Sequence, residues 1–486
     1  MCGVVGIIGV ERASAALSMG LQALQHRGQD ACGMGTHDAG RFHMHKDLGL
    51  VVNVFSEQTL SALKGTSGIG HTRYPTVGSG VREDAQPFYT RRPGVLMAHN
   101  GNVTNLEELE TRLLARGLHV QSQCDVEPIL LVFAEALSER RPFGHTTEDV
   151  VFAVREVLQG VRGAYTCVAL CEVDGKETLV AFRDPHGIRP GSYGRSPSGG
   201  WMVASETVAM DALGFEVVGD LPRGSVVLMR AGEEPVVREV DPKSARPCVF
   251  ERIYFARPDS LMEEGRVNST RWAMGKRMGE EWARLGLEAD VVIPVPDTSR
   301  TAAQAMAEVL GLPYREGFIK NRYSGRTFIM PDAAARQAAH RLKLNPIPEI
   351  FEGKRVILVD DSIVRGTTVR RLADLAKSTR PAAVHMAVYS PPVKHPCYYG
   401  IDMPSKNELV AAKLPEAEWA AAFGVDSVTF ISLEGLRETM GSLEGKTICM
   451  ACFDGDYAVP VSGGEIAAIV MDRRGPGDLG PTGSGV

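Results

Sequence analysis

The sequence predicts two domains, an α+β domain that mixes strands and helices, followed by an α/β domain built on a parallel sheet. Three observations support this fold class. The chain has 486 residues, more than one hydrophobic core usually supports, and 44% of them are apolar. Short strand-like runs alternate with helical patterns in the first half. In the second half, buried strands are each followed by a helix, as right-handed βαβ crossovers require.

The first domain is predicted from apolar runs with strand composition and from helical periodicity near 12–25, 105–117 and 126–138. The strand-like runs are GVVGIIGV (3–10), GVLMAHNG (94–101), YTCVALCEV (165–173), KETLVAFRD (176–184) and GSVVLMR (224–230). The polar, proline-containing stretch 231–248 is typical of a connection between domains. We therefore place the first domain at 2–235 and the second at 248–470.

The second domain is predicted from the runs ADVVIPVPDTS (289–299), KRVILVDDSIVRGTT (354–368) and AAVHMAVYS (382–390). Helical segments follow the first two, which is typical of a parallel sheet with helices on its faces. Ligands of such sheets bind beyond the carboxyl ends of the strands. The tail, residues 471–486, is rich in Gly and Pro, and we expect it to be disordered.

Composition excludes several classes of function. The net charge of -6 gives no basic surface for nucleic acid or an anionic membrane. No apolar run approaches the ~18 residues of a membrane span, and the start lacks the features of a secretory signal. The sequence thus predicts a soluble, cytoplasmic protein. Its 9 cysteines are too sparse for a disulfide scaffold, which leaves thiols, metal ligands or nucleophiles.

Two carboxylates, Asp360 and Asp361, follow the predicted strand 356–359. The next residues, SIVRGTT (362–368), have the composition of a loop that binds phosphate at a helix N-terminus. Acids beside such a loop indicate a polyol or Mg²⁺. The alternative is that both acids only cap the next helix.

The stretch KNRYSGRTFIMP (320–331) places Lys320, Arg322 and Arg326 around a glycine. It is either a solvated basic loop or one that closes over a pyrophosphate and excludes water.

VILVDDSIVRGTT resembles the phosphoribosyl pyrophosphate (PRPP) motif of type I phosphoribosyltransferases. The resemblance implies that the paired acids contact the ribose hydroxyls and bound magnesium, and that the loop holds the 5′-phosphate. The PRPP-binding residues implied are Asp360, Asp361, Ser362, Arg365, Gly366, Thr367, Thr368, Lys320 and Arg326.

Cys2 becomes the first residue if the initiator Met is removed. Its α-amine, with a reference pKa of about 7.7–8.0, could then serve as the base for its own thiol. The alternative is an ordinary buried Cys in a strand, because free Cys is among the most buried residue types.

Together with MCGVVGI, three stretches resemble the glutaminase domain of the N-terminal-nucleophile amidotransferases: LQHRGQDACG (24–33), GHTRYPTVGSG (70–80) and LMAHNGNVTN (96–105). The resemblance implies an αββα sandwich, Cys2 as nucleophile, and an oxyanion hole from Asn100 and Gly101. It also places Arg27 near the nucleophile and assigns Arg73 and Asp125 to glutamine, although Cys124 stands where the family has Ser or Thr. His26, His71 and His99 are left out of the catalytic set, because an α-amine base makes a His base unnecessary.

Both motifs in one chain resemble the glutamine PRPP amidotransferase family, over nearly all of residues 2–455. This implies ammonia transfer from Cys2 to C1 of PRPP, with Mg²⁺ held near Thr298, Asp360 and Asp361. It also implies a loop 320–331 ordered by PRPP, and channel or interface roles for Tyr74, Tyr254 and Tyr323. A homotetramer inhibited by purine nucleotides is expected.

Four cysteines remain: Cys248, Cys397, Cys449 and Cys452. Four thiolates can hold Zn²⁺ or a [4Fe-4S] cluster, and the C-x-x-C of 449–452 could also be a redox pair. The resemblance implies the iron–sulfur branch of the family, with these residues as the [4Fe-4S] ligands.

Two alternatives stay open. The first is another glutamine-dependent enzyme, such as a sugar-phosphate amidotransferase or asparagine synthetase, which VDDSIVRGTT disfavours. The second is a PRPP-sensing regulatory protein without chemistry, which the presence of Cys2, Arg73, Asn100 and Gly101 disfavours.

Overall fold

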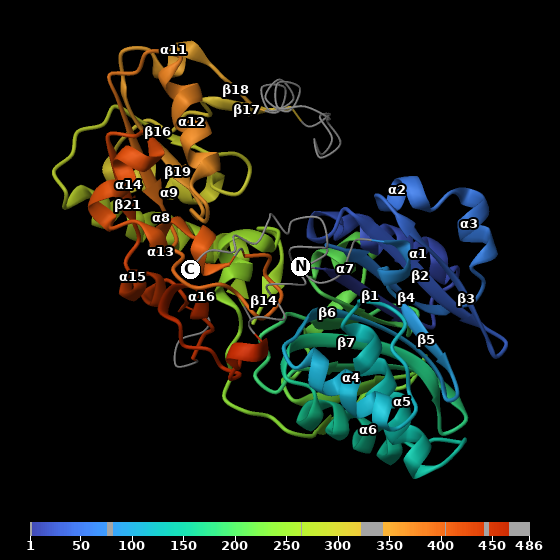
Figure 1. Ribbon diagram of the computed structural model, residues 1–486. Coiled ribbons are helices and arrows are strands. Elements are labelled where there is room, and N and C mark those ends of the chain that lie inside the picture. The colour runs from blue at the N-terminus through green and yellow to red at the C-terminus, as the bar shows by residue number, and fades with distance from the viewer. Residues whose placement is uncertain are drawn as a thin grey trace.

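The computed structural model describes residues 2–74, 81–263, 265–321, 344–403, 405–441 and 447–465. Figure 1 shows two bodies, one built on strands from the first half of the chain and one on the parallel sheet of the second half. The predicted disordered tail, 471–486, lies outside the described residues. Within these ranges, no helix combines the length and the apolar character needed to span a membrane.

Two antiparallel sheets form the first body. The seven-stranded sheet has the order β11-β9-β10-β1-β4-β2-β3 and the six-stranded sheet the order β13-β12-β8-β7-β6-β5. The strands of the first are β1 Gly3–Ile8, β2 Ala31–Asp38, β3 Arg41–Leu48, β4 Ser67–Arg73, β9 Ser192–Arg195, β10 Trp201–Ala204 and β11 Glu216–Asp220. Those of the second are β5 Phe88–Arg91, β6 Gly94–Val103, β7 Gly163–Val173, β8 Lys176–Arg183, β12 Ser225–Met229 and β13 Val236–Glu239.

Three apolar layers hold this body together. Between the sheets, Ile69, Leu96 and Val168 belong to one buried cluster. The outer face of the first sheet is covered by α1 (Ala13–Ala23) and α7 (Val208–Leu213). The outer face of the second is covered by α4 (Leu106–Ala115), α5 (Val126–Arg140) and α6 (Thr147–Gly160). The αββα sandwich is therefore confirmed.

The second body is a four-stranded sheet of order β16-β19-β20-β21, with every neighbouring pair parallel. Its strands are β16 Val291–Pro294, β19 Arg355–Asp360, β20 Ala383–Val388 and β21 Ser427–Phe430. One face packs on α8 (Val267–Ala283) and α9 (Arg300–Leu310). The other packs on α12 (Thr367–Lys377) and α14 (Glu416–Phe423). The predicted α/β domain with a parallel sheet is confirmed.

Successive residues of a strand serve opposite faces of this sheet. Val292 belongs to the cluster with α8 and α9, whereas Ile293 belongs to the cluster with α12 and α14. This is the period of two expected for a strand, and it explains the near-continuous apolar run of β16. The carboxyl ends of β16 and β19 therefore lie side by side, with Pro294 paired to Val359.

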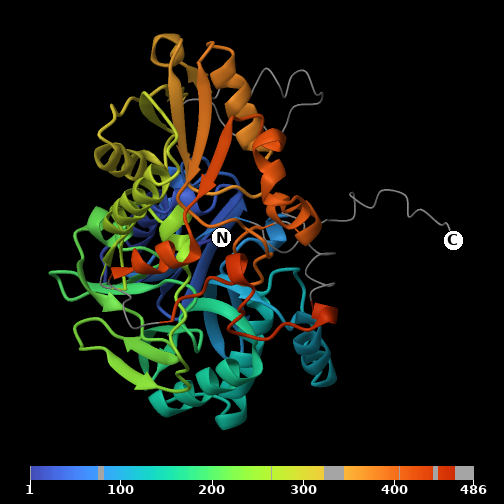
Figure 2. The same cartoon turned by 90° about the vertical axis from the view of Figure 1, so that its left-hand side faces the viewer.

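Short elements make up the remainder, and several of them lie between the two bodies, as β14 and α16 do in Figure 1. Figure 2 shows the parallel sheet from the side, above the antiparallel sheets. The other elements are η1 Gln25–Arg27, α2 Val51–Val54, α3 Glu57–Ala62, η2 Arg82–Asp84, η3 Glu251–Phe255, β14 Leu261–Met262, β15 Gly265–Arg266, β17 Phe318–Lys320, β18 Leu344–Pro346, α11 Pro348–Phe351, η4 Lys406–Glu408, α13 Val410–Lys413, α15 Leu433–Glu438 and α16 Ala451–Asp454.

Candidate active sites

Cys2 stands at the entrance of β1, a fully buried strand in the middle of its sheet. Its Sγ donates to the carbonyl oxygen of Tyr74 at 3.7 Å, and its backbone nitrogen donates to Oδ1 of Asn100 at 3.2 Å. The residue is 8% exposed. The thiol thus lies where β1, β4 and β6 meet, with little access for bulk water.

Asn100 and Gly101 lie near the end of β6, opposite Thr166 and Tyr165 of β7. Asn100 is fully buried, and its Nδ2 has no hydrogen-bond partner among the described residues. A buried donor without a partner is costly, so such a group indicates a site that a ligand completes. Gly101 must be glycine, because a Cβ there would lie 2.2 Å from the carbonyl oxygen of Ala164.

Arg27 holds the backbone of Cys2 in place. Its Nε donates to the carbonyl oxygen of Cys2 at 2.9 Å, and its two terminal nitrogens lie 2.5 Å from Glu206 and 2.8 Å from Glu251. Burial alone would lower the pKa of Arg27, but the charges of Glu251 and Glu206 raise it above its ordinary value. Arg27 is therefore a permanent buried cation, shared between carboxylates from two parts of the chain.

Arg73 and Asp125 lie on the same side of the first body. Asp125 accepts a 3.0 Å hydrogen bond from the backbone nitrogen of Val103 and lies 3.3 Å from Nε2 of His99. Burial would raise the pKa of Asp125, but His99, this hydrogen bond and Arg73 lower it on balance, so the carboxylate stays ionised. A guanidinium of Arg73 lies 3.6 Å from Asp84. A buried cation and a buried anion whose charges interact suit an amino acid in its zwitterionic form.

Asp360 ends β19, and the chain turns at once, so that both acids face one region. The backbone nitrogen of Asp361 donates to Oδ1 of Asp360 at 2.9 Å, and Oγ of Ser362 donates to Oδ1 of Asp361 at 2.6 Å. Burial raises the pKa of Asp361 to about 6. Burial and the charge of Asp361 raise the pKa of Asp360 well above its ordinary value. A buried acid pair of this kind is a site for a cation or for hydroxyl groups.

The loop after the acids turns into α12 through Gly366, which has a φ of 77° and stands before Thr367. A Cβ at Gly366 would lie 2.8 Å from the ring of Phe423, so the position needs glycine on two grounds. The first backbone N–H groups of a helix have no partner within the helix and point toward the loop that precedes it. In α12, Thr367 and Thr368 add hydroxyl groups at the same place. The alternative that the acids only cap the next helix is wrong, because the N-cap of α12 is Gly366 and no described side chain makes a cap hydrogen bond there.

Thr298 and Lys320 approach the same edge of the sheet. The carbonyl oxygen of Thr298 accepts a 3.4 Å hydrogen bond from the hydroxyl of Tyr389, which follows β20. Nζ of Lys320 lies 3.0 Å from Asp297. Of the predicted loop 320–331, residues 322–331, including Arg322, Tyr323 and Arg326, lie outside the described residues. Arg365 lies 3.3 Å from Glu408 at the surface.

The two bodies meet beside Cys2. The hydroxyl of Tyr74 donates to Asp402 at 3.1 Å, and Nδ2 of Asn102 donates to the carbonyl oxygen of Tyr398 at 3.0 Å. Tyr254, the other predicted interface tyrosine, lies in η3 and is 47% exposed. Residues of the second half thus reach the end of β6, next to the buried donor of Asn100.

The four late cysteines come from three segments that meet. Cys248 and Cys449 form a parallel backbone bridge, and Sγ of Cys397 accepts from the backbone nitrogen of Tyr399 at 3.4 Å. Burial raises the pKa of the thiols of Cys248, Cys449 and Cys452. A negative charge on Cys397 raises each of these pKa values further. Across the residues that the structure describes, no group of three or more His, Cys, Asp or Glu side chains is placed to hold a metal ion.

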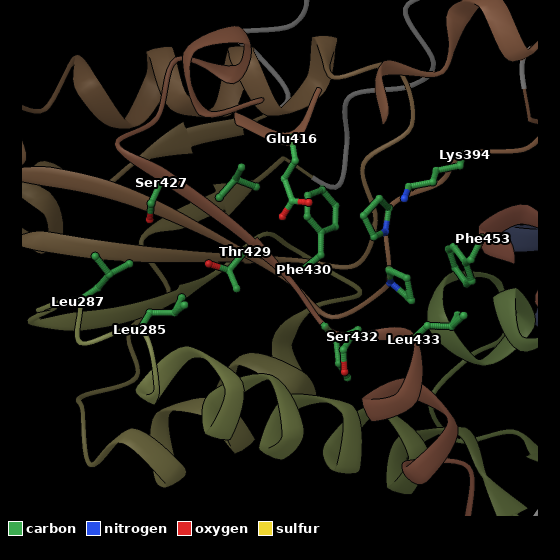
Figure 3. Close-up of a pocket in the computed structure, with 14 residues that line it drawn as sticks. Leu285, Leu287, Lys394, Glu416, Ser427, Thr429, Phe430, Ser432, Leu433 and Phe453 are labelled. Atoms are coloured by element: carbon green, nitrogen blue, oxygen red, sulfur yellow. The ribbon is translucent and has the colours of Figure 1, made fainter. Parts of the chain in front are cut away.

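A cavity of about 690 Å³ is lined by the edge strand β21, by loop residues that include Leu285, Leu287 and Pro391, and by Phe453 of α16. Figure 3 shows Leu285, Leu287 and Phe453 around it. None of the predicted site residues lines it.

Several site residues were not predicted from the sequence. Glu206 and Glu251 are 179 and 224 residues from Arg27 along the chain, and no local pattern marks them as its partners. Arg271, whose charge lowers the pKa of Asp361, lies inside α8. Tyr389 follows a strand that the sequence did predict, and a polar residue just past such a strand was a usable signal.

Comparison with known proteins gives the same two parts. A family model for a glutamine amidotransferase domain matches residues 71–212, and one for a phosphoribosyl transferase domain matches residues 271–407. The described architecture agrees with both. The chain therefore joins a glutamine amidotransferase of the N-terminal-nucleophile class to a phosphoribosyltransferase.

Relatives match over nearly the full length. Amidophosphoribosyltransferase of Pasteurella multocida is 43% identical over 93% of this chain and 91% of its own length. That of Methanocaldococcus jannaschii is 39% identical over 95% of this chain and 98% of its own. A solved structure of glutamine PRPP amidotransferase from B. subtilis, complexed with ADP and GMP, is 36% identical, with a TM-score of 0.85, over 95% of this chain and 98% of that chain.

The chain belongs to the amidophosphoribosyltransferase family. Its activity is glutamine-dependent amidophosphoribosyl transfer, the first step of purine biosynthesis.

Proposed function

We propose that Cys2 is the nucleophile that hydrolyses glutamine, and that Arg27, Asn100 and Gly101 complete its catalytic site. The observation that carries this proposal is the placement of Cys2 between the carbonyl of Tyr74 and the amide of Asn100, with the unpartnered Nδ2 of Asn100 beside it. The thiol sulfur attacks the side-chain amide carbon of glutamine. The oxygen of the tetrahedral intermediate then accepts hydrogen bonds from Nδ2 of Asn100 and the backbone N–H of Gly101.

The α-amine of Cys2 is the base in this proposal, which requires removal of Met1. The amine takes the thiol proton as the C–S bond forms and returns it to the leaving nitrogen, so that ammonia departs and a glutamyl thioester remains. Water then hydrolyses the thioester to glutamate. Oδ1 of Asn100, which accepts from the nitrogen of Cys2 at 3.2 Å, holds the base in position.

Arg73 and Asp125 bind the α-carboxylate and the α-ammonium of glutamine. The ionised state of Asp125 supports its part, because its pKa is lowered in spite of burial. Arg73 offers a planar fork of donors that matches a carboxylate.

Asp360 and Asp361 bind the ribose of PRPP, and residues 362–368, with Ser362, Arg365, Gly366, Thr367 and Thr368, bind its 5′-phosphate. Lys320 and Arg326 contact the pyrophosphate. The acid pair fits a divalent cation, since two buried carboxylates with raised pKa values are stabilised in their ionised forms by a positive charge. Mg²⁺ held by these acids and Thr298 would neutralise charge on the leaving pyrophosphate.

Ammonia released at Cys2 passes internally to the second domain and forms a bond to C1 of PRPP as the bond to pyrophosphate breaks. The contacts of Tyr74 with Asp402 and of Asn102 with Tyr398 support this proposal, since they join the two domains at the end of β6, beside Cys2. Tyr254 and Tyr323 are the other residues we assign to this boundary.

The domain limits that we propose are 2–235 and 248–470, and the compartment is the cytoplasm. We also propose a homotetramer inhibited by purine nucleotides. The structure of the B. subtilis relative in complex with ADP and GMP supports the proposed binding of purine nucleotides.

The thiols of Cys248, Cys397, Cys449 and Cys452 would hold a [4Fe-4S] cluster, which ties the C-terminal segment to the second domain. What supports this proposal is that the three segments carrying these cysteines meet, with Cys248 and Cys449 paired in a backbone bridge. Iron and sulfide analysis of anaerobically purified protein, beside Cys452→Ser, tests this. About four irons per chain, lost in the variant, would support it, whereas zinc or no metal in the wild type would contradict it.

The catalytic proposal is tested by measuring glutamate and pyrophosphate release with glutamine and PRPP, and pyrophosphate release with ammonia and PRPP. Cys2→Ser should abolish the glutamine-dependent reaction and leave the ammonia-dependent one intact. Cys171→Ala, which alters a buried thiol of β7, is the matched control and should retain both. Loss of both reactions in a folded Cys2→Ser protein, or an active protein whose intact mass includes Met1, would overturn the proposal.

A further inference from the structure

Gly400 of the second domain lies directly against the backbone of Gly101. A Cβ placed on Gly400 would lie 3.1 Å from both the carbonyl carbon and the carbonyl oxygen of Gly101, and 3.5 Å from its Cα. Gly400 has a φ of 101°, which side chains other than hydrogen rarely tolerate. Both the conformation and the close approach therefore require glycine here.

The segment around Gly400 is held from several sides. The carbonyl oxygen of Tyr398 accepts from Nδ2 of Asn102 at 3.0 Å, and Asp402 accepts from Tyr74 at 3.1 Å. The hydroxyl of Tyr399 donates to the carbonyl of Val459 and accepts from its backbone nitrogen, each at 2.8 Å. The segment 398–402 is thus anchored to its own domain, to β6 through Asn102, and to Tyr74, the residue that follows β4.

Gly101 is enclosed on its other side as well. A Cβ there would lie 2.2 Å from the carbonyl oxygen of Ala164 and 2.6 Å from Cα of Tyr165, in the neighbouring strand β7. Gly101 therefore lies against β7 of the first domain, and its carbonyl group lies against segment 398–402 of the second. At neither contact is there room for a side chain.

We propose that segment 398–402 positions the oxyanion donor at Gly101, with Gly400 and Asn102 as the positioning residues. The inference rests on the proposed function, in which the N–H of Gly101 stabilises the tetrahedral intermediate of glutamine hydrolysis. The second domain then supplies one wall of the first domain's oxyanion hole. A donor must lie within hydrogen-bond distance of the oxyanion to be effective, so a small displacement of this peptide weakens it.

Gly400→Ala tests the proposal, because the new methyl group would push against the carbonyl of Gly101. We expect the kcat of glutamine hydrolysis to fall about 10-fold or more, as loss of part of an oxyanion hole does, with KM for glutamine changed by less than about 2-fold. The affinity for the aldehyde analogue of glutamine, which forms a tetrahedral adduct with the thiol, should fall in parallel with kcat. Alkylation of Cys2 by iodoacetamide, which forms no oxyanion, should keep its rate.

Gly311→Ala is the matched control, since Gly311 also has a positive φ, of 64°, but has open space around its Cβ position. It should retain all four properties. Asn102→Ala is the second variant and should show the pattern of Gly400→Ala with a smaller amplitude. It decides the matter if Gly400→Ala does not fold.

An unchanged aldehyde affinity in Gly400→Ala and Asn102→Ala would overturn the proposal. The proposal would also be overturned if the rate of Cys2 alkylation fell by the same factor as kcat. The contact between segment 398–402 and Gly101 would then affect the reactivity of the thiol and not the oxyanion hole. Asn100→Ala in the same assay separates failure of the proposed oxyanion hole from failure of the role of segment 398–402. If it retains aldehyde affinity, the proposed oxyanion hole fails, whereas if it alone loses affinity, only the role of segment 398–402 fails.

Discussion

The backbone nitrogen of Cys2 donates to Oδ1 of Asn100 at 3.2 Å, and this contact orients the rest of the Asn100 side chain. With Oδ1 engaged, Nδ2 points into a buried space where no described residue accepts its hydrogen bond. One side chain therefore holds the nitrogen of Cys2 and, in the proposed mechanism, presents a donor to the reacting carbonyl. An amide suits this position because it carries an acceptor and a donor on two separate atoms, whereas a carboxylate would offer no donor.

Asn100→Ala should lower kcat for glutamine hydrolysis by about 10²- to 10³-fold, the usual effect of removing one preorganised oxyanion donor. The ammonia-dependent reaction should be unchanged, since the PRPP site is separate. Steady-state kinetics with each nitrogen source measures this. Asn53→Ala, at an exposed position of α2, is the control. A decrease confined to KM would contradict the assignment.

Arg73→Lys should raise KM for glutamine by about 10- to 100-fold, because a lysine cannot form the two parallel hydrogen bonds that a guanidinium offers a carboxylate. The chemistry at the thiol is the same, so kcat should change much less. The comparison of glutamine with its α-amide analogue, which lacks the carboxylate, completes the test. If wild type and variant discriminate between the two equally, Arg73 does not bind the carboxylate.

Glu251→Ala should destabilise the protein by about 3–5 kcal/mol, the range for removing one member of a buried ion pair, because Arg27 would keep only Glu206 as its counter-charge. The carboxylate of Glu251 is 2.8 Å from Arg27, and both side chains are almost fully buried. The shift of the urea unfolding curve gives the value. Glu352→Ala breaks an exposed pair with Arg380 and should cost less than about 1 kcal/mol. Equal effects of the two variants would show that Arg27 does not depend on Glu251.

Because His71 is buried, we expect the free energy of unfolding to decrease as the pH falls below about 6.5. His71 is fully buried, both ring nitrogens lack hydrogen-bond partners among the described residues, and burial lowers its pKa well below the ordinary value. As the pH falls through the unfolded pKa of about 6.5, the unfolded chain gains a proton that the folded chain refuses. The free energy of unfolding should then fall by up to about 1.4 kcal/mol per pH unit from this residue.

Urea unfolding of wild type and His71→Gln at about pH 5.5 and 7.5 measures that contribution as a difference between the two pH dependences. The variant should lose less stability on acidification than the wild type. His119→Gln, at an exposed position, should follow the wild type. Parallel curves for all three proteins would show that His71 accepts its proton in the folded state.

Much of the fold could be predicted because its elements carry their own periodicity. The helical patterns near 12–25, 105–117 and 126–138 correspond to α1, α4 and α5, and the apolar run before Asp360 is β19. These elements bury one face or both, so their apolar residues recur at the spacing of a helix or strand.

The partners of Arg27 could not be predicted in the same way. Glu206 and Glu251 are single acids in segments that show no local pattern, and they reach Arg27 only through the tertiary fold. The same is true of Gly400, which is one of the 52 glycines in the chain. Its importance follows from a contact between segments about 300 residues apart, a kind of information that local periodicity does not contain.

The ion pairs of Arg27 limit how the glutamine amidotransferase domain can be separated from the rest of the chain. Glu206 belongs to the first domain, whereas Glu251 lies in η3, beyond the predicted boundary at 248. A first domain excised at that boundary would keep Arg27, which donates to the backbone carbonyl of Cys2, and would lose one of its two carboxylate partners. A version of the first domain that is to fold alone must therefore extend through η3, so that it includes Glu251.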